Sequence, residues 1–71
     1  MKYKLSKLAG KMKEEGYTQR DVSNSLKRSG EYVGKRLRGQ GYFNMREIYS
    51  ICDLLHIPYS EILDYFPKFQ I

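Results

Sequence analysis

Several residue types that carry chemistry are scarce in this chain. Its 71 residues include one cysteine, one histidine and no tryptophan. A single cysteine excludes an internal disulfide, and one cysteine with one histidine provides neither a zinc ligand set nor a catalytic pair. The sequence also holds no nucleophile–base set and no phosphate-cradling loop. It therefore predicts no metal site, no cofactor and no enzymatic activity.

Long apolar stretches are missing as well. No apolar run is long enough to span a membrane, and the sequence shows no signal-peptide core. We therefore expect a cytoplasmic protein without a membrane partner. A chain of 71 residues makes one domain, residues 1–71, with a small core. Because this length leaves no room for a ligand-sensing or cleavage domain, no small-molecule ligand is expected.

Charge is distributed unevenly along the chain. Residues 1–46 hold 12 Lys and Arg against 4 Asp and Glu, a net charge of +8. Residues 47–71 hold 1 Lys against 4 Asp and Glu, a net charge of −3. A basic front and an acidic back suggest that one face of the protein meets a polyanion.

Apolar residues at helical spacing, separated by turn residues, predict an all-α fold of five short helices. Polar residues that suit helix N-termini mark three of the starts. Thr18 is followed at the third position by Asp21, and Asn44 by Glu47, so both pairs resemble a capping box. The expected helices lie roughly at residues 1–16, 18–26, 29–38, 44–56 and 59–66.

The third expected helix has two distinct sides. On a helical wheel, Val33 and Leu37 share the side that should face the core. Glu31, Lys35 and Arg38 gather on the opposite side, with Gly34 beside them. That side offers hydrogen-bonding groups, positive charge and little bulk, which suits the DNA major groove. A solvated basic face is the alternative, and the composition of this helix alone leaves it open.

Residues 18–39 resemble the helix-turn-helix of the phage repressor and Cro family, the Cro/C1-type or XRE-like domains. The matching features are the opening Thr18-Gln19, the small Ser23 where that family usually has Ala, a serine before the second helix and a glycine after it. Apolar residues match as well. The matching apolar residues are Val22, Leu26 and Val33, the serine is Ser29 and the glycine is Gly39. The resemblance covers roughly residues 4–66.

The turn departs from the family pattern. This chain has Lys27-Arg28 where the family usually has Gly-Ile. We expect either a strained left-handed residue that is not glycine or a remodelled turn, and the loss of one core contact.

The resemblance implies a set of DNA-contacting residues. Gln19 would contact phosphate and brace the third helix. Base contacts are expected from Ser29, Gly30, Glu31, Gly34 and Lys35. The resemblance also implies phosphate contacts from Gln19, Arg38, Gln40 and Tyr42. A further phosphate contact is expected at the N-terminus of the fourth helix, from Asn44 and Arg46, because exposed backbone N–H groups there favour an anion.

The C-terminal stretch is rich in apolar residues. Eight of the fifteen residues from 57 to 71 are Ile, Leu, Tyr or Phe. One helix on a small domain cannot bury them all, so we expect a dimer patch among Tyr65, Phe66, Phe69 and Ile71. Folding of this tail onto the core of its own chain is the alternative.

The resemblance implies a sequence-specific regulator of transcription that binds double-stranded DNA. A small Cro-like phage or prophage repressor would bind a near-palindromic operator as a homodimer, in the bacterial cytoplasm or nucleoid, or in the host cytoplasm if phage-encoded. The fold that the resemblance implies is lambda-repressor-like, with the helix-turn-helix at the second and third of five helices. The alternatives in function are a protein-interaction module on a helix-turn-helix scaffold, such as an anti-repressor or adaptor, and an antitoxin or restriction-control regulator.

Overall fold

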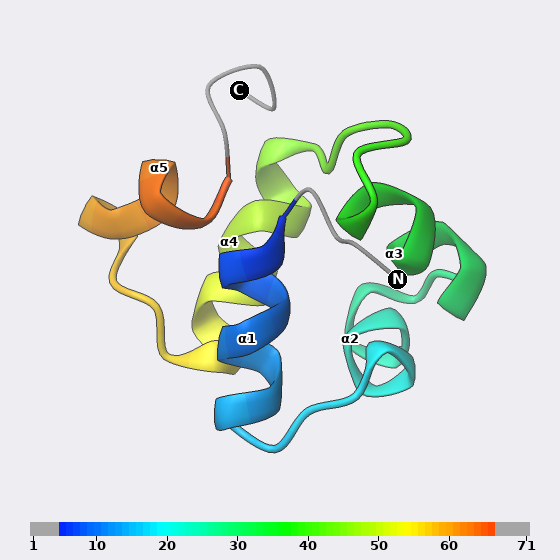
Figure 1. Cartoon of the computed structure of the whole chain (residues 1–71), viewed down its shortest axis with the longest axis horizontal. Helices are drawn as coiled ribbons and strands as arrows, with labels where there is room; N and C mark the ends of the chain where they lie inside the picture. Colours follow the sequence, from blue (N-terminus) through cyan, green and yellow to red (C-terminus); the bar gives the residue numbers. More distant parts are fainter. Residues whose placement is uncertain (1–4, 67–71) are drawn as a thin grey trace.

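The structure, a computed structural model, describes residues 5–66, and these are all-helical (Figure 1). They form α1 (Ser6–Glu14), α2 (Gln19–Leu26), α3 (Gly30–Leu37), α4 (Met45–Leu55), the short 3₁₀ helix η1 (Tyr59–Glu61) and α5 (Ile62–Tyr65). There is no strand in this part of the chain. The predicted all-α class with five helices is confirmed.

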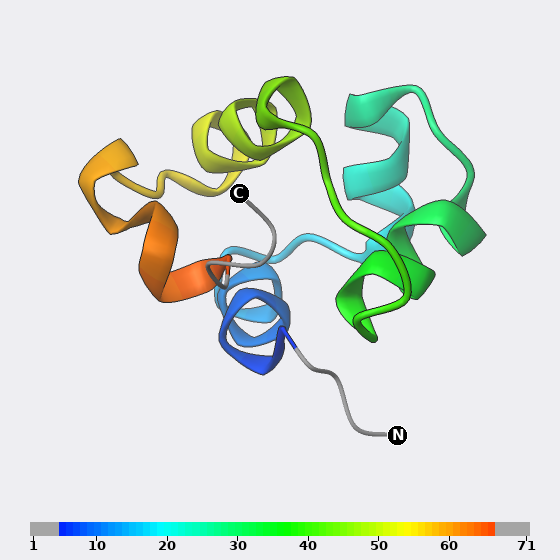
Figure 2. The ribbon, with the colours of Figure 1, turned by 90° about the horizontal axis from the view of Figure 1, so that it is seen from above.

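The five α-helices of residues 5–66 are arranged around a common core. α2 packs against both α3 and α4, and α1 contacts α3 on one side and α5 on the other. In both views α3 and α5 lie at opposite sides of the molecule (Figures 1 and 2). The outer surface of α3 is therefore remote from the C-terminal helices.

The core consists of apolar side chains that are almost fully buried. Phe43, in the loop between α3 and α4, is buried and packs edge-on against Phe66, with ring centroids 6.0 Å apart. Burying one such side chain contributes roughly 1.5–3 kcal/mol. Cys52 is buried as expected, and desolvation raises the pKa of its thiol. The other members are Leu5, Leu8, Met12, Val22, Val33, Leu37, Ile48, Ile51, Leu55 and Ile57.

The first helix begins later than expected. We predicted a helix from Met1, but α1 starts at Ser6, and residues 1–4 lie outside the described part of the chain. Leu5 has a non-helical backbone, and its N–H donates to the Leu37 carbonyl at 3.1 Å. This bond ties the N-terminal segment to the last turn of α3, where a carbonyl lacks a partner within its own helix.

The predicted caps are confirmed. The Thr18 hydroxyl accepts from the Asp21 N–H at 3.1 Å, and the Asp21 carboxylate accepts from the Thr18 N–H at 2.8 Å. The same reciprocal pair joins Asn44 and Glu47 at the start of α4. Because each cap satisfies backbone donors locally, the sequence alone sets where α2 and α4 begin.

The C-terminal helix and the expected dimer patch differ from the prediction. The stretch expected to be one helix is split into η1 and α5. Phe66 is buried against Phe43, so the expectation of a surface-exposed Phe66 is wrong. Tyr65 is half-buried against the core, with the Lys7 ammonium 5.0 Å from its ring centroid. Phe69 and Ile71 lie outside the described residues.

Candidate nucleic-acid interface

The turn between α2 and α3 forms without a glycine. Lys27 adopts the left-handed conformation at φ 57° and ψ 41°. Its N–H donates to the Asn24 carbonyl at 3.2 Å, and the N–H of Arg28 donates to the Ser23 carbonyl at 2.9 Å. The expected left-handed residue other than glycine is therefore confirmed. In this conformation a residue with a side chain is strained by about 1 kcal/mol or more relative to glycine.

The start of α3 is held by a cap and by a side chain from α2. The Ser29 hydroxyl accepts from the Tyr32 N–H at 3.1 Å. Gln19 donates through Nε2 to the carbonyl of Gly30 at 2.9 Å. Gln19 is the first residue of α2 and Gly30 the first of α3, so this bond fixes the two helix starts relative to each other. The bracing that the resemblance implied for Gln19 is confirmed.

Two charged side chains extend from the outer face of α3. The side chains of Glu31 and Lys35 are 74% and 47% exposed, and their Oε1 and Nζ atoms are 3.3 Å apart. An exposed pair of this kind is worth little because water competes with each partner. Both groups can therefore exchange this contact for a ligand at small cost.

We expected Gly34 on the open face of α3, but the structure places it elsewhere. It is buried, and a Cβ added there would meet Gln19 Nε2 at 2.8 Å and Arg38 Nη1 at 3.4 Å. The side chains of Gln19 and Arg38 thus cover the backbone at Gly34. The predicted role of Gly34 in base contact is therefore corrected to a role in helix packing. Gly30, the other glycine expected to contact bases, is half-buried at the start of α3.

The residues expected to contact phosphate fall into two groups. Gln19 and Arg38 meet over Gly34, and both are half-buried. The others are exposed in the loop after α3 or in the first turn of α4. They are Gln40, Tyr42, Asn44 and Arg46.

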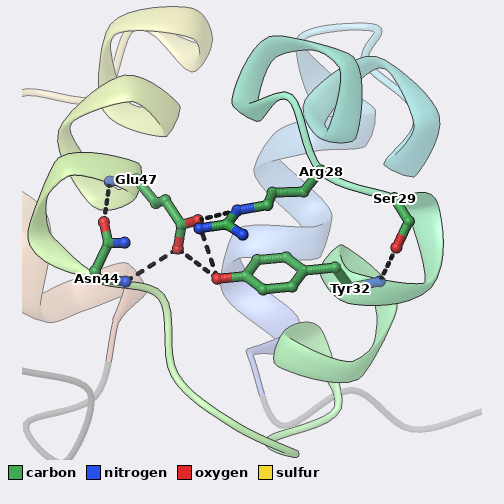
Figure 3. A network of polar contacts seen from close by, with 5 residues as sticks. All are labelled: Arg28, Ser29, Tyr32, Asn44 and Glu47. Carbon is green, nitrogen blue, oxygen red and sulfur yellow. Dashed lines mark hydrogen bonds and ion pairs between the residues drawn. The ribbon is translucent and has the colours of Figure 1, made fainter.

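A buried carboxylate connects α3 to α4, and sequence reasoning missed this connection (Figure 3). Glu47 is only 5% exposed. Its carboxylate accepts from Arg28 Nε at 3.1 Å and from the Tyr32 hydroxyl at 2.8 and 3.0 Å. It also accepts from the Asn44 N–H at 3.1 Å. Burial and the bond to Glu47 raise the pKa of the Tyr32 phenol.

This polar network occupies the place of an expected apolar contact. We predicted that Arg28 would remove a core contact, and the structure shows that it forms an ion pair with Glu47 instead. Glu47 has the spacing of a capping residue, which explains only one of its bonds. No local pattern links Arg28 to a carboxylate nineteen residues away.

Arg36 is a second side chain that the sequence did not single out. Its Cζ lies 3.7 Å from the centroid of the Tyr32 ring, a close cation–π contact. A Cβ added at Gly41 would lie 3.1 Å from the same Cζ, so the loop backbone covers the guanidinium. Arg36 also borders a hollow of about 330 Å³ on the flank of α3, which Ser29, Glu31, Tyr32 and Lys35 complete.

Some site types are not found among residues 5–66. No helix in this range is long and apolar enough to cross a bilayer. The same residues contain no group of three or more His, Cys, Asp or Glu side chains placed to hold a metal ion.

Comparison with known families places the chain in one of them. Residues 1–69 match the family model described as Protein of unknown function (DUF739). The chain therefore belongs to this family. No curated protein matches the chain significantly.

Proposed function

We propose that this member of the DUF739 family binds double-stranded DNA sequence-specifically. It would do so through a Cro/C1-type, lambda-repressor-like helix-turn-helix made of α2 and α3. The observation that carries the proposal is the geometry of α3. This helix is capped by Ser29, braced by Gln19, and presents an ion pair between Glu31 and Lys35 on its outer face.

In this proposal α3 enters the major groove and reads base edges. Lys35 donates to guanine O6 and N7, and Glu31 accepts from cytosine N4. Ser29 retains a hydroxyl proton to donate, because its oxygen only accepts in the cap. The bond from Gln19 to Gly30 fixes the helix that carries these groups, which limits the conformational entropy lost on binding.

Phosphate contacts fix the register of the protein on the duplex. On one flank of α3, Gln19 and Arg38 lie together over Gly34. Beyond α3, exposed polar side chains continue along the loop and the first turn of α4. These are Gln40, Tyr42, Asn44 and Arg46.

The biological role that we propose is repression by occupying an operator. Two protomers would bind half-sites about one helical turn apart, so the operator would be near-palindromic. With Phe66 buried, the exposed apolar side chains outside α3 include Tyr49 on α4, Tyr59 on η1 and Leu63 on α5, which we call the aromatic surface. We assign dimer contacts to the aromatic surface. A phage or prophage regulator acting in the bacterial cytoplasm fits this proposal.

The direct test is selection of bound sequences from a randomised duplex pool at two salt concentrations. We expect enrichment of a near-palindrome with half-sites about one turn apart. Selection without enrichment, together with weak binding that disappears as salt rises, would reduce the function to nonspecific electrostatic attraction.

A protein-interaction module is the second candidate, and the aromatic surface favours it. Tyr49 and Tyr59 are 42% and 52% exposed, with ring centroids 4.8 Å apart, and Leu63 is 59% exposed. Sedimentation velocity on the purified chain, with and without selected duplex, separates the candidates. A dimer seen on DNA supports the regulator. A monomer that binds no DNA, yet forms a complex of fixed stoichiometry with a purified protein, supports the module.

A further inference from the structure

The flank of α3 that carries Tyr32 and Arg36 has no assigned role in the proposed DNA contact. Tyr32 and Arg36 are four residues apart and so lie on the same side of the helix. Gln19 and Arg38 cover the opposite flank at Gly34. Glu31 and Lys35 project between the two flanks. A helix in the major groove is bordered by a sugar–phosphate backbone on each side. Gln19 and Arg38 account for one of them, while the loop after α3, whose backbone at Gly41 covers Arg36, lies on the flank that faces the other.

Arg36 is confined on this second flank by contacts on two sides. Its guanidinium lies 3.7 Å from the Tyr32 ring centroid on one side and against the backbone at Gly41 on another. The Tyr32 ring is fixed in turn, because its hydroxyl donates to the buried Glu47 carboxylate (Figure 3). A planar cation held by stacking loses little conformational entropy when it binds an oxyanion.

The hydrogen-bonding capacity of Arg36 is incompletely used. Its Nε is buried and has no hydrogen-bond partner among the described residues. A buried donor without an acceptor is unusual and destabilises the free protein. Arg36 also borders the hollow described above. If a ligand oxygen occupied that hollow, a small shift of the guanidinium along the Tyr32 ring would bring the Nε donor to this acceptor.

The charges around the hollow favour an anion. Lys35 and Arg36 line it together with the Ser29 side chain. Glu31 lines it too, but its carboxylate is paired with the Lys35 ammonium at 3.3 Å. Glu31 and Lys35 line this hollow and also form the outer face of α3 that is proposed to read bases, so the hollow lies next to that face. In the proposed DNA complex, an oxyanion at this place would be a backbone phosphate of the strand along this flank.

We propose that this hollow binds one phosphodiester of DNA in each half-site, with Arg36 as its charged ligand and Tyr32 as the residue that positions Arg36. The inference rests on the proposed DNA-binding function and extends it to the second backbone of the groove. It gives the protein contacts to both strands from a single helix.

The test uses duplexes of the selected operator in which one phosphate at a time is replaced by an uncharged methylphosphonate. We expect one position per half-site, on the strand not contacted by Gln19 and Arg38, where this replacement weakens wild-type binding about tenfold. Arg36→Gln should weaken binding to the unmodified duplex by a similar factor and be insensitive to the replacement at that position. Its salt slope should fall by about 1 per protomer.

Lys13→Gln is the matched control, because it removes one positive charge from an exposed position on α1. It should retain the wild-type sensitivity to every methylphosphonate. Circular dichroism checks the folding of each variant. If Arg36→Gln does not fold, Arg36→Lys is tested in its place. This variant keeps the charge, so it should bind with the wild-type salt slope. The methylphosphonate at the position assigned to Arg36 should weaken its binding less than it weakens wild-type binding.

The outcomes separate this inference from the proposed function. If the wild type selects no sequence and binds no duplex, the proposed function fails and the phosphate site fails with it. If the wild type binds its operator while Arg36→Gln keeps the wild-type methylphosphonate pattern and salt slope, or Arg36→Lys keeps the full wild-type pattern, only the phosphate site is refuted.

Discussion

At the residue scale, Lys27 shows how this chain forms its turn without the glycine that the resembled family prefers. Its backbone has φ 57°, a region where a side chain is strained. Both hydrogen bonds of the turn are nevertheless formed, so the strain is balanced by local bonding. His56, at φ 59°, ends α4 in the same conformation.

Relief of this strain gives the first prediction. Lys27→Gly should raise the free energy of unfolding by about 0.5–1 kcal/mol, because the left-handed penalty exceeds the added entropy of glycine in the unfolded chain. Urea unfolding followed by circular dichroism measures the change. Lys13→Gly, the same substitution within α1, should lower stability by about 1 kcal/mol. Destabilisation by both variants would show that Lys27 is not strained.

Glu47 gives the second prediction at this scale. Its buried carboxylate accepts bonds from Arg28, Tyr32 and the Asn44 backbone. Glu47→Gln removes the charge that balances Arg28 and turns an amide N–H₂ toward groups that donate, so we expect a loss of about 2–3 kcal/mol in unfolding free energy. Urea unfolding again provides the value.

The control for this prediction is Glu31→Gln, which changes an exposed carboxylate paired only with Lys35. Its effect on stability should be much smaller, because water screens this ion pair. Equal effects of the two variants would mean that the network around Glu47 contributes no more than an exposed salt bridge.

At the scale of the elements, one side chain of α2 packs over one glycine of α3. A Cβ at Gly34 would lie 2.8 Å from Gln19 Nε2, the end of a flexible side chain. We expect Gly34→Ala to displace Gln19 and break its bond to Gly30. Because alanine favours the helix by about 0.5–1 kcal/mol, the net change in stability should be near zero.

The cost should instead fall on DNA binding. With its brace lost, α3 should bind the selected operator about tenfold more weakly, as measured by fluorescence anisotropy. Gly10→Ala is the matched control. Gly10 is exposed in α1, with no atom within 4 Å of an added Cβ, so this variant should gain stability and keep operator affinity. Unchanged operator binding by Gly34→Ala would argue against the bracing role of Gln19.

A second link joins the C-terminal ends of α1 and α4. Glu15 Oε1 lies 3.2 Å from His56 Nδ1, and Glu15 Oε2 lies 3.3 Å from Lys11 Nζ. The bond with His56, followed by that with Lys11, holds the pKa of the Glu15 carboxyl below its ordinary value of 4.5. A lowered pKa means that the charged form is favoured in the folded state, so its stabilisation is complete above pH 4.5 and is lost as the pH falls through the native pKa.

Wild type should therefore melt at a higher temperature than Glu15→Gln at pH 6, and the difference should vanish at strongly acidic pH. Thermal scans followed by circular dichroism between pH 2 and pH 7 check this expectation. Glu14→Gln, at a more exposed carboxylate 3.6 Å from Lys11, serves as the control and should show a weaker dependence. A gap between wild type and Glu15→Gln that widened in acid would contradict the sign.

At the scale of the whole molecule, charge and topology act together. The residues proposed to contact DNA all precede position 47, in the part of the sequence with a net charge of +8. Residues 47–66, which hold most of α4 together with η1 and α5, contain no Lys or Arg. Since α3 and α5 lie at opposite sides of the fold, the basic α3 lies opposite the acidic segment of η1 and α5.

This arrangement predicts a strong salt dependence. If a dimer neutralises ~6–10 phosphates, operator affinity should fall by ~10³–10⁵ between 50 and 200 mM salt. Anisotropy titrations at four or more salt concentrations give the slope. The slope should not change when charge is altered on the remote side, for which Asp64→Asn on α5 is a suitable variant. A slope near zero for the wild type would contradict the electrostatic part of the proposal.

The sequence by itself determined the features that depend on neighbours along the chain. The caps at Thr18, Ser29 and Asn44, and the turn at Lys27, involve groups at most five residues apart. Their geometry is local, so residue type and spacing specify it. The apolar periodicity of the same segments also predicted the all-α class, because it shows which face of each helix is buried.

Only the tertiary structure decided which distant groups meet. It brought Arg28 and Tyr32 to the carboxylate of Glu47, and laid Gln19 over Gly34. It also turned Phe66 toward Phe43, which removed it from the surface where we had expected it. These contacts depend on the angles at which helices pack, and those angles follow from the shape of the whole core rather than from any local pattern.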